Sequence, residues 1–506
     1  ITKKVEAIQY PRYNYKYDLI PEKVESIVVP EKEKDDKINI LFIIPWMITG
    51  GADLFNLNLV KGLDKDRFDV TIITTEPNRN VLRQLFEKND DGTELAKVYD
   101  LTSFLNQKYW LAFIDYIINK ENINLILNSN SKIGYSMLPY IKNKYTDIPI
   151  IDYVHMEEWY NRNGGYSRYS AMYKSVIDKT LVCNENSRKI LIDYFGKSED
   201  EVETVYIGVD ENKFNPEKYN KEELKKKYQI DNKKIISYIC RISEQKRPML
   251  LLKIIAKLKE ERQDFKVLVV GDGNLLSRMK DKAKELNIFD DITFTGALDN
   301  IAEIYAISDL TINCSLKEGL ALTSYESLSM GVPVVSSDVG GQKELITGEV
   351  GEIIPLMQNE KEIYLEDYNT NEITNFVSAI NKVLDNLEEY KVNCRQRIID
   401  NFTIDKMIEK MTAIFEEVKG KPSRLKIENG EGLKNNRNLT KELVTINLKN
   451  DEVEYKWECL EYERKMYGRA YSAEGLNYKK ELLKDRLWNI PLWRGVINLY
   501  HKFRGE

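Results

Sequence analysis

Short apolar runs rich in β-branched residues alternate with helix-like patterns from Lys37 onward. Each run is too short for a typical helix and is bounded by polar or turn-forming residues. Buried strands that alternate with helices predict a parallel sheet with crossover connections. The expected strands of this first set are 38–44, 70–75, 123–128, 150–154 and 180–183.

The same alternation restarts after Asn212, with expected strands at 234–239, 266–271, 291–295, 309–313 and 332–336. Two successive α/β domains, at 37–212 and 213–402, are the simplest account of the two sets. Apolar residues at helical spacing after Thr403, a suitable N-cap, predict a closing helix at 403–418. We expect this helix to pack back on the first domain.

Both ends of the chain depart from this pattern. Residues 1–36 are rich in Tyr, Lys and Pro and predict an extension or linker. The chain starts at Ile1 and no signal-peptide pattern follows, so we expect a trimmed chain or a piece of a longer polypeptide, and whether a domain precedes it stays open. Residues 419–506 predict a basic, aromatic, helical tail that either touches anionic lipid or packs on the body of the protein.

Composition narrows the class of protein. With 506 residues, 42% of them hydrophobic and 31% charged, the chain is long enough for about two to four globular domains. The net charge of −6 argues against nucleic acid as a partner, although residues 419–506 carry 19 Lys and Arg against 13 Asp and Glu. Five cysteines without a Cys-x-x-Cys pair favour reduced thiols, and no run is long enough to span a membrane. We therefore expect a cytoplasmic protein.

The densest chemical signal lies between Cys314 and Gly341. An expected strand ends near Cys314, a turn containing Glu318 and Gly319 follows, and a helix opens near Leu322 and Thr323 with Glu326 in its first turn. The free N–H groups of a helix N-terminus can bind an anion. Two carboxylates beside such an anion site can accept hydrogen bonds from hydroxyl groups. The segment therefore predicts a ligand in which a phosphate is attached to a polyol. Taken alone, the pair is also explained as a loop carboxylate and a helix-start carboxylate placed by the helix dipole.

The segment resembles family 4 of the retaining glycosyltransferases, which have the GT-B fold. The likeness rests on the Glu-x7-Glu spacing of Glu318 and Glu326 and on the later Gly-x-Pro-Val-Val and Gly-Gly elements. It implies two Rossmann-like doubly wound α/β domains that face each other across a cleft. It also implies that Glu318 contacts the transferred sugar and Glu326 the nucleotide ribose. Ala321 departs from the family, in which a second glycine is common here.

A second motif follows the first expected strand of the second domain. Arg241 offers a planar fork and Lys246 a point charge, a pair suited to a diphosphate. The resemblance makes them the family's diphosphate site, with Cys240 in place of the usual glycine. Solvated surface charges are the plain structural alternative, but a strand's carboxyl end is where α/β folds bind ligands.

Glycine-rich turns complete the expected donor site. Gly50 and Gly51 lie between an expected strand and an expected helix. Members of the family have a glycine-rich loop here that faces the donor diphosphate, although a tight turn alone would also explain the two glycines. A Gly-x-Gly at Gly271 and Gly273 invites a dinucleotide-binding interpretation, but Leu276 occupies the third glycine position. In the family this turn and the one at Gly296 and Ala297 lie beside the nucleobase.

The first domain offers fewer candidates. His155 ends an expected strand, and the resemblance implies that it binds the donor sugar, whereas burial as a structural histidine is the alternative. Asn128 and Asn130 stand where many members carry another histidine. The aromatic loop 157–166 is an acceptor loop or a plain surface loop. Asp64 and Asp66 form an Asp-x-Asp in a turn before a strand, so we predict no metal and no cofactor.

The resemblance therefore implies a retaining glycosyltransferase of hexosyltransferase type, which we expect to be metal-independent. Its donor is a nucleotide-diphosphate sugar of UDP or GDP type, and its acceptor is a glycan, a lipid-linked molecule or a protein in bacterial cell-surface polysaccharide or glycoconjugate synthesis. We expect it in the cytoplasm or at the inner face of the membrane, with peripheral contact through the tail. A sugar-nucleotide epimerase or phosphorylase, or a non-catalytic scaffold with a vestigial site, remain the alternatives.

Overall fold

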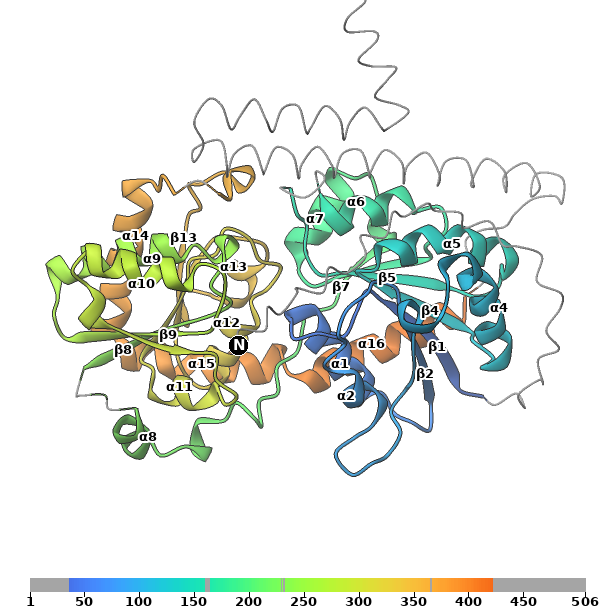
Figure 1. Ribbon diagram of the computed structural model, residues 1–506, viewed down its shortest axis with the longest axis horizontal. Coiled ribbons are helices and arrows are strands. Elements are labelled where there is room, and N and C mark those ends of the chain that lie inside the picture. Colours follow the sequence, from blue (N-terminus) through green and yellow to red (C-terminus); the bar gives the residue numbers. More distant parts are fainter. Residues whose placement is uncertain (1–35, 160–163, 229, 231–232, 365, 422–506) are drawn as a thin grey trace, which may run out of the picture. The chain divides into compact units, whose positions relative to one another are not determined.

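The computed structural model describes residues 36–159, 164–228, 230, 233–364 and 366–421. Within them lie two parallel sheets with helices on both faces (Figure 1). The expected α/β fold of two doubly wound domains is confirmed. The extension at 1–36 (all but its last residue) and almost all of the tail at 419–506, including its aromatic stretch, lie outside the described residues.

The first sheet has the order β3-β2-β1-β4-β5-β6-β7. Its strands are β1 Ile38–Ile44, β2 Phe68–Thr74, β3 Lys97–Asp100, β4 Leu125–Ser129, β5 Ile150–Val154, β6 Lys179–Val182 and β7 Val202–Thr204. All seven residues of β1 are buried, as expected for a central strand covered on both faces. The helices between them are α1 Gly51–Gly62, α2 Arg83–Glu87, α3 Leu101–Phe104, α4 Trp110–Lys120, α5 Lys132–Lys144, α6 Gly165–Met172 and α7 Glu185–Asp193.

The second sheet has the order β10-β9-β8-β11-β12-β13. Its strands are β8 Lys234–Ile239, β9 Phe265–Val270, β10 Ile292–Gly296, β11 Leu310–Asn313, β12 Val334–Ser337 and β13 Gly351–Ile354. Its helices are α8 Lys221–Lys227, α9 Pro248–Glu261, α10 Leu276–Glu285, α11 Ala302–Ile307, α12 Leu322–Ser329, α13 Gln342–Leu345, α14 Thr370–Asp385 and α15 Leu387–Asn401.

In each sheet the strand order reverses beside the first strand. β1 pairs with both β2 and β4, and β8 pairs with both β9 and β11. Loops that leave the carboxyl ends of β1 and β4, or of β8 and β11, diverge to opposite faces, and open α/β sheets bind ligands at that point. The fold thus brings the turn at Gly50 to one such point, and the loops of Lys246 and Glu318 to the other.

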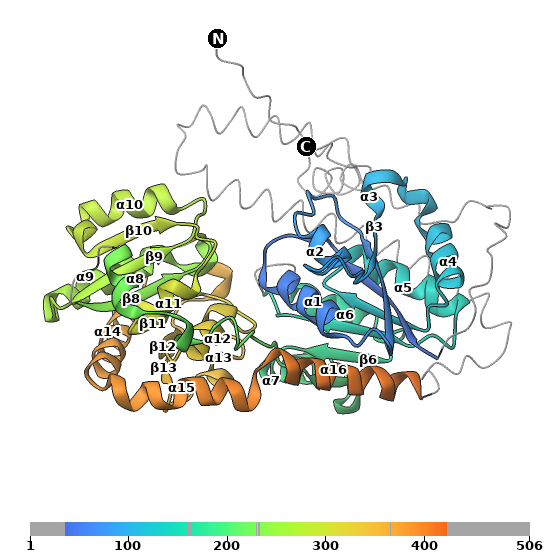
Figure 2. The same ribbon diagram turned by 90° about the horizontal axis from the view of Figure 1, so that it is seen from below.

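The last described helix, α16 Ile404–Lys419, packs on the first domain although it follows the second in sequence (Figure 2). Thr403 caps it by accepting the backbone N–H of Lys406. Its buried face lies against α1 and β1, and the ring of Phe415 meets that of Phe68, the first residue of β2, edge to face with centroids 6.2 Å apart. This helix ties the two domains together outside their direct connection at residues 205–220.

Candidate active site

Two loops of the second domain bring a lysine and a glutamate together at the reversal point. Lys246, in a short 3-10 turn after β8, forms an ion pair with Glu318, which lies in the loop after β11. The same carboxylate oxygen of Glu318 accepts the hydroxyl of Ser315 at 2.7 Å. The two loops are also joined by their backbones, since Leu316 N–H donates to the Gln245 carbonyl at 2.8 Å. The Glu318 carboxylate is therefore held in one orientation.

Arg247, which the sequence motifs did not single out, supports the Lys246 and Glu318 loops through buried hydrogen bonds. Its guanidinium is almost completely buried and donates to the Cys314 carbonyl at 2.6 Å and the Ser337 hydroxyl at 2.8 Å. It also pairs with the fully buried Glu372 of α14 at 2.8 Å. Arg241 differs: it is exposed at the end of β8, and within the described part of the chain no ion pair or hydrogen bond holds its side chain. Arg247 has a structural role, and Arg241 is available to a ligand.

Helix α12 begins at Leu322 and Thr323, as expected, with Ala321 as its N-cap residue. The expectation that Glu326 lies in the first turn is wrong, because it is the fifth helical residue and its side chain points into the buried interior. There it accepts the hydroxyl of Tyr305 at 3.0 Å. Burial raises the pKa of Glu326 to about 7, and the Tyr305 hydrogen bond opposes that rise.

The glycines of the β9 turn allow it to lie directly against the loop after β8. A Cβ at Gly271 would stand 1.9 Å from the Cys240 carbonyl oxygen, and one at Gly273 would stand 2.2 Å from that of Ile242. Gly271 also has a φ of +129°, and its N–H donates to the Gly296 carbonyl at 2.9 Å. Gly296 has a φ of +74°, and the exposed Ala297 follows it. Gly271, Gly273, Gly296 and Ala297 thus line neighbouring turns at one edge of the sheet.

The first domain presents its own glycine turn to α12. Gly51 begins α1, and a Cβ there would lie 3.6 Å from the side chain of Leu322, so the first turns of α1 and α12 are in contact. Gly50 is the N-cap residue of α1. Asp53 in the same first turn is buried, which raises its pKa to about 7. Two helix N-termini thus meet at the place where the sequence predicts the donor.

His155 lies directly after β5 and is buried between the rings of Phe55 and Tyr153. Its Nε2 is 3.1 Å from the hydroxyl of Ser129, which donates its own proton to Asn56 at 3.0 Å. The Ser129 oxygen must then accept from Nε2–H, which leaves Nδ1 as an acceptor. Nδ1 is buried and has no hydrogen-bond partner in the described residues. Burial lowers the pKa of His155 to about 3, so the ring is neutral.

The loops of His155 and Glu318 touch. A Cβ at Gly319 would lie 2.0 Å from the His155 carbonyl oxygen, and Asn184 Nδ2 donates to the Gly319 carbonyl at 3.0 Å. The fold thus gathers Glu318, Lys246 and His155 from two domains.

Two other candidates are not part of this group. The side chain of Asn128 is fully buried and donates to the Ser131 carbonyl at the start of α5, where it has a structural role. Of the aromatic loop 157–166, residues 160–163 lie outside the described part of the chain. Trp159, which precedes them, packs edge to face on Tyr194 with ring centroids 4.8 Å apart.

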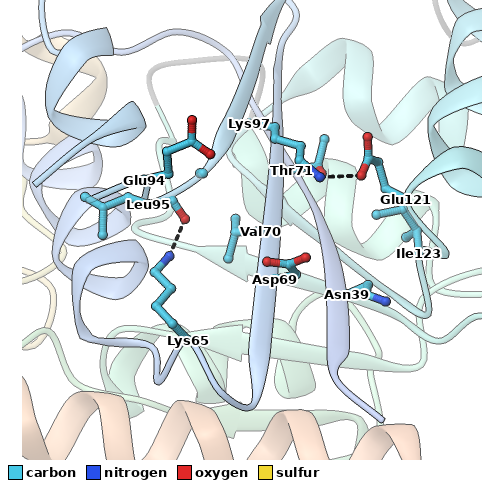
Figure 3. A pocket seen from close by; sticks show the side chains of 11 residues that line it. Asn39, Lys65, Asp69, Val70, Thr71, Glu94, Leu95, Lys97, Glu121 and Ile123 are labelled. Atoms are coloured by element: carbon cyan, nitrogen blue, oxygen red, sulfur yellow. Dashed lines mark hydrogen bonds and ion pairs between the residues drawn. The ribbon is translucent and has the colours of Figure 1, made fainter. Parts of the chain in front are cut away.

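The opposite edge of the first sheet carries the Asp-x-Asp pair. Asp64 and Asp66 lie there in the exposed turn between α1 and β2. A hollow of about 60 Å³ opens nearby, and two of the lysines that line it are engaged: Lys97 pairs with Glu121, and Lys65 donates to the Leu95 carbonyl (Figure 3). By the same measure one water molecule needs about 10–15 Å³, so this hollow holds a few water molecules and not a sugar nucleotide. In the described ranges no cluster of three or more His, Cys, Asp and Glu side chains is placed to hold a metal.

Family models match both domains of the chain. The model for glycosyl transferases group 1 matches residues 220–400, and the model for glycosyltransferase family 4 matches residues 49–213. The Bacillus subtilis protein EpsF, classed as a glycosyltransferase, is 32% identical over 59% of this chain and 79% of its own length. This chain belongs to the group 1 glycosyltransferases. The resemblance of the Glu-x7-Glu segment is thereby confirmed at the level of the family.

Other relatives of this glycosyltransferase act on different molecules. The Escherichia coli UDP-Gal:α-D-GlcNAc-diphosphoundecaprenol α-1,3-galactosyltransferase is 24% identical over 76% of this chain and 98% of its own length. The Bacillus anthracis N-acetyl-α-D-glucosaminyl L-malate synthase is 36% identical, but the match spans only 31% of this chain and 40% of that protein.

Solved structures agree on the GT-B fold. A glycosyltransferase from Rickettsia africae superposes with a TM-score of 0.62 at 22% identity, over 76% of this chain and all of the other. Anabaena HepE, solved with UDP, gives 0.59 at 16% identity, over 75% of this chain and all of the other. Among the described residues, no helix combines the length and the apolar character needed to cross a membrane.

Proposed function

We propose that this glycosyltransferase moves a hexose-type sugar from a UDP- or GDP-sugar to an acceptor hydroxyl, with retention of anomeric configuration and without a metal. The observation that carries the proposal is the pairing of Glu318 with Lys246 at the reversal point of the second sheet, against the loop of His155. Anabaena HepE, with the same fold, was solved with UDP, and the Escherichia coli relative uses a UDP-sugar and a lipid-linked acceptor.

The side chains divide the work by charge. Lys246 has three N–H donors, so it can keep Glu318 while it binds a phosphate oxygen. The exposed Arg241 and the backbone N–H groups at Leu322 and Thr323 supply further positive potential, in the role that a metal plays in other transferases. Glu326 would accept hydroxyl groups of the ribose, and the turns at Gly271 and Gly296 would contact the base through their backbones.

Transfer then follows from this placement. The anomeric C–O bond breaks, its electron pair leaves with the diphosphate, and the acceptor hydroxyl attacks from the same face of the sugar. The acceptor proton passes to the departing phosphate oxygen. Glu318 and the acceptor atom Nδ1 of His155 would orient the sugar through its hydroxyl groups, and contact between the two domains would exclude water.

In this proposal the first domain binds the acceptor. We further propose a glycan, a lipid-linked molecule or a protein as acceptor, in the assembly of a bacterial cell-surface polysaccharide or glycoconjugate at the cytoplasmic face of the membrane. The lipid-linked acceptor named for the Escherichia coli relative supports this assignment.

The test begins with donor identification. A thermal-shift screen of UDP-glucose, UDP-galactose, UDP-N-acetylglucosamine and GDP-mannose should show one donor that raises the melting temperature, because a ligand of the native state stabilises it. Transfer from that donor should persist in EDTA, and NMR of the product should show the donor's anomeric configuration. Turnover of the donor without any acceptor to an epimer would support the epimerase alternative instead.

Two substitutions test the site. Glu318→Gln and Lys246→Met should each lower kcat by at least about 100-fold, because each removes a charge that acts on the sugar or the diphosphate in the transition state. Glu388→Gln and Lys284→Met, at exposed helical positions, are the matched controls and should leave kcat unchanged. Near-normal transfer by folded Glu318→Gln or Lys246→Met would refute the assignment.

A further inference from the structure

A second ion pair lies one residue away from the first and joins the two domains. Lys317, in the loop after β11, pairs with Glu157, in the loop after β5, and their side chains are 6% and 1% exposed. Glu157 also accepts the Ser187 hydroxyl at 2.8 Å and the Asn186 amide at 3.2 Å, both from α7. Lys317 is 3.5 Å from a second carboxylate, that of Glu360, which in turn accepts the Trp159 N–H at 2.7 Å.

The two partners are neighbours of the proposed sugar-binding residues. Lys317 precedes Glu318, and Glu157 follows His155 by two positions. Their charges are used separately: the Lys317 ammonium binds Glu157 and Glu360, while the Glu318 carboxylate binds Lys246 and Ser315. Lys317 therefore faces away from the carboxylate that would meet the sugar, and its backbone carbonyl is fixed by Gln245 Nε2 at 2.8 Å.

Burial of such a pair needs a reason other than stability. Removing a lysine and a carboxylate from water is unfavourable, and their attraction often only offsets that cost. What a buried pair does provide is a defined geometry, because either charge left without the other is strongly unfavourable. Here the ion pair fixes the distance between the Glu318 loop and the His155 loop. The backbones of these two loops are already in contact at Gly319.

We infer that Lys317 and Glu157 are positioning residues for sugar transfer: their ion pair holds the Glu318 loop of the donor domain against the His155 loop of the other domain. The inference rests on the proposed function. Neither residue contacts the donor. Without the pair, the donor domain binds its nucleotide as before. The fraction of molecules in which Glu318 and His155 contact the same sugar is lower.

A double-mutant cycle tests the inference, with Lys317→Met, Glu157→Gln and the double variant. Each single substitution should lower kcat by about tenfold, while the Kd for the free nucleotide of the identified donor, UDP or GDP, should change less than twofold. The kcat of the double variant should be no lower than that of the less active single variant, because the second substitution removes a side chain whose partner is already gone. A purely structural role would not separate kcat from nucleotide affinity in this way.

Lys142→Met is the matched control. Lys142 and Asp178 form another buried ion pair, 1% and 9% exposed, entirely within the first domain. Its loss should lower the melting temperature and leave kcat unchanged in assays well below that temperature.

Several results would overturn the inference. They are an unchanged kcat in Lys317→Met, a nucleotide Kd that rises in step with the fall in kcat, multiplicative losses in the double variant, or an equal loss of kcat in Lys142→Met. Failure of the proposed function is distinguishable, because the wild-type protein itself would then transfer no sugar from any donor.

Discussion

The protonation of Glu326 shows how one buried side chain links stability to ligand binding. Its ordinary pKa is 4.5, and burial raises the folded-state pKa to about 7. Between these values the folded protein holds a proton that the unfolded chain releases. Stability must therefore fall as pH rises from about 4.5 to about 7, by an amount on the order of 3 kcal/mol. A ligand hydroxyl that donates to the ionised carboxylate would offset this loss, as the proposed ribose contact requires.

Glu326→Gln tests this directly. The amide can still accept from Tyr305 but does not ionise, so we expect the variant to be more stable than the wild type at pH 8 and nearly equal to it at pH 4.5. Urea unfolding at the two pH values measures the difference. Asp53 titrates in the same range but is present in both proteins, so it cancels. The variant should also bind the donor nucleotide less tightly. A stability difference that does not change with pH would contradict the pKa assignment.

Single residues also mark where sequence reasoning stops. Glu318 and Lys246 are predictable because strong local motifs contain them. Their contact is not, since it depends on β8 and β11 being neighbours across 72 residues of chain. Ser315, Tyr305 and Arg247 carry no such signal: a serine after a strand, a tyrosine in a helix and a second basic residue beside Lys246 become supports of the site only when the fold surrounds them.

At the scale of elements, the strands that the apolar pattern does not predict are β3, β7 and β13. All three lie at a sheet edge, and two of them have only half-buried or exposed positions over much of their length. An edge strand pairs on one side only and is often short, so it does not need a continuous apolar run. Central strands such as β1 and β5 are buried on both faces and are predicted almost to the residue.

The turns between elements should show a graded response to one added methyl group. Gly271→Ala combines a left-handed φ with a clash against the Cys240 carbonyl, and should lower the free energy of unfolding by roughly 2–4 kcal/mol. Gly296 also has a left-handed φ, but the space around it is open, so Gly296→Ala should lower the free energy of unfolding by about 1–2 kcal/mol. Gly348→Ala has neither, and should change it by less than about 0.5 kcal/mol. Denaturant unfolding of the three variants gives the order, and equal effects would show that close approach does not shape the β9 turn.

At the scale of the whole molecule, the two domains are joined at several separate places. Helix α16 returns from the second domain to the first, and the Glu344 carboxylate of α13 accepts the N–H groups of Glu185 and Asn186 at the start of α7, at 2.8 and 2.9 Å. A carboxylate at a helix N-terminus is favourable because it satisfies free N–H groups. The candidate site lies among these contacts, so its geometry depends on the approach of one domain to the other and not on either sheet alone.

Gly319 offers a direct test of that dependence. A methyl group there would stand 2.0 Å from the His155 carbonyl oxygen of the other domain, and backbone atoms cannot approach so closely. Because its φ lies outside the left-handed region, alanine is acceptable to the second domain by itself. The clash is relieved if the domains move apart, so Gly319→Ala should lower kcat by more than about tenfold, while the Kd for UDP or GDP stays within about twofold. Gly348→Ala controls for the added methyl group. If Gly319→Ala instead abolished nucleotide binding, the donor site would depend on both domains from the first encounter, and domain approach could not be a separate step.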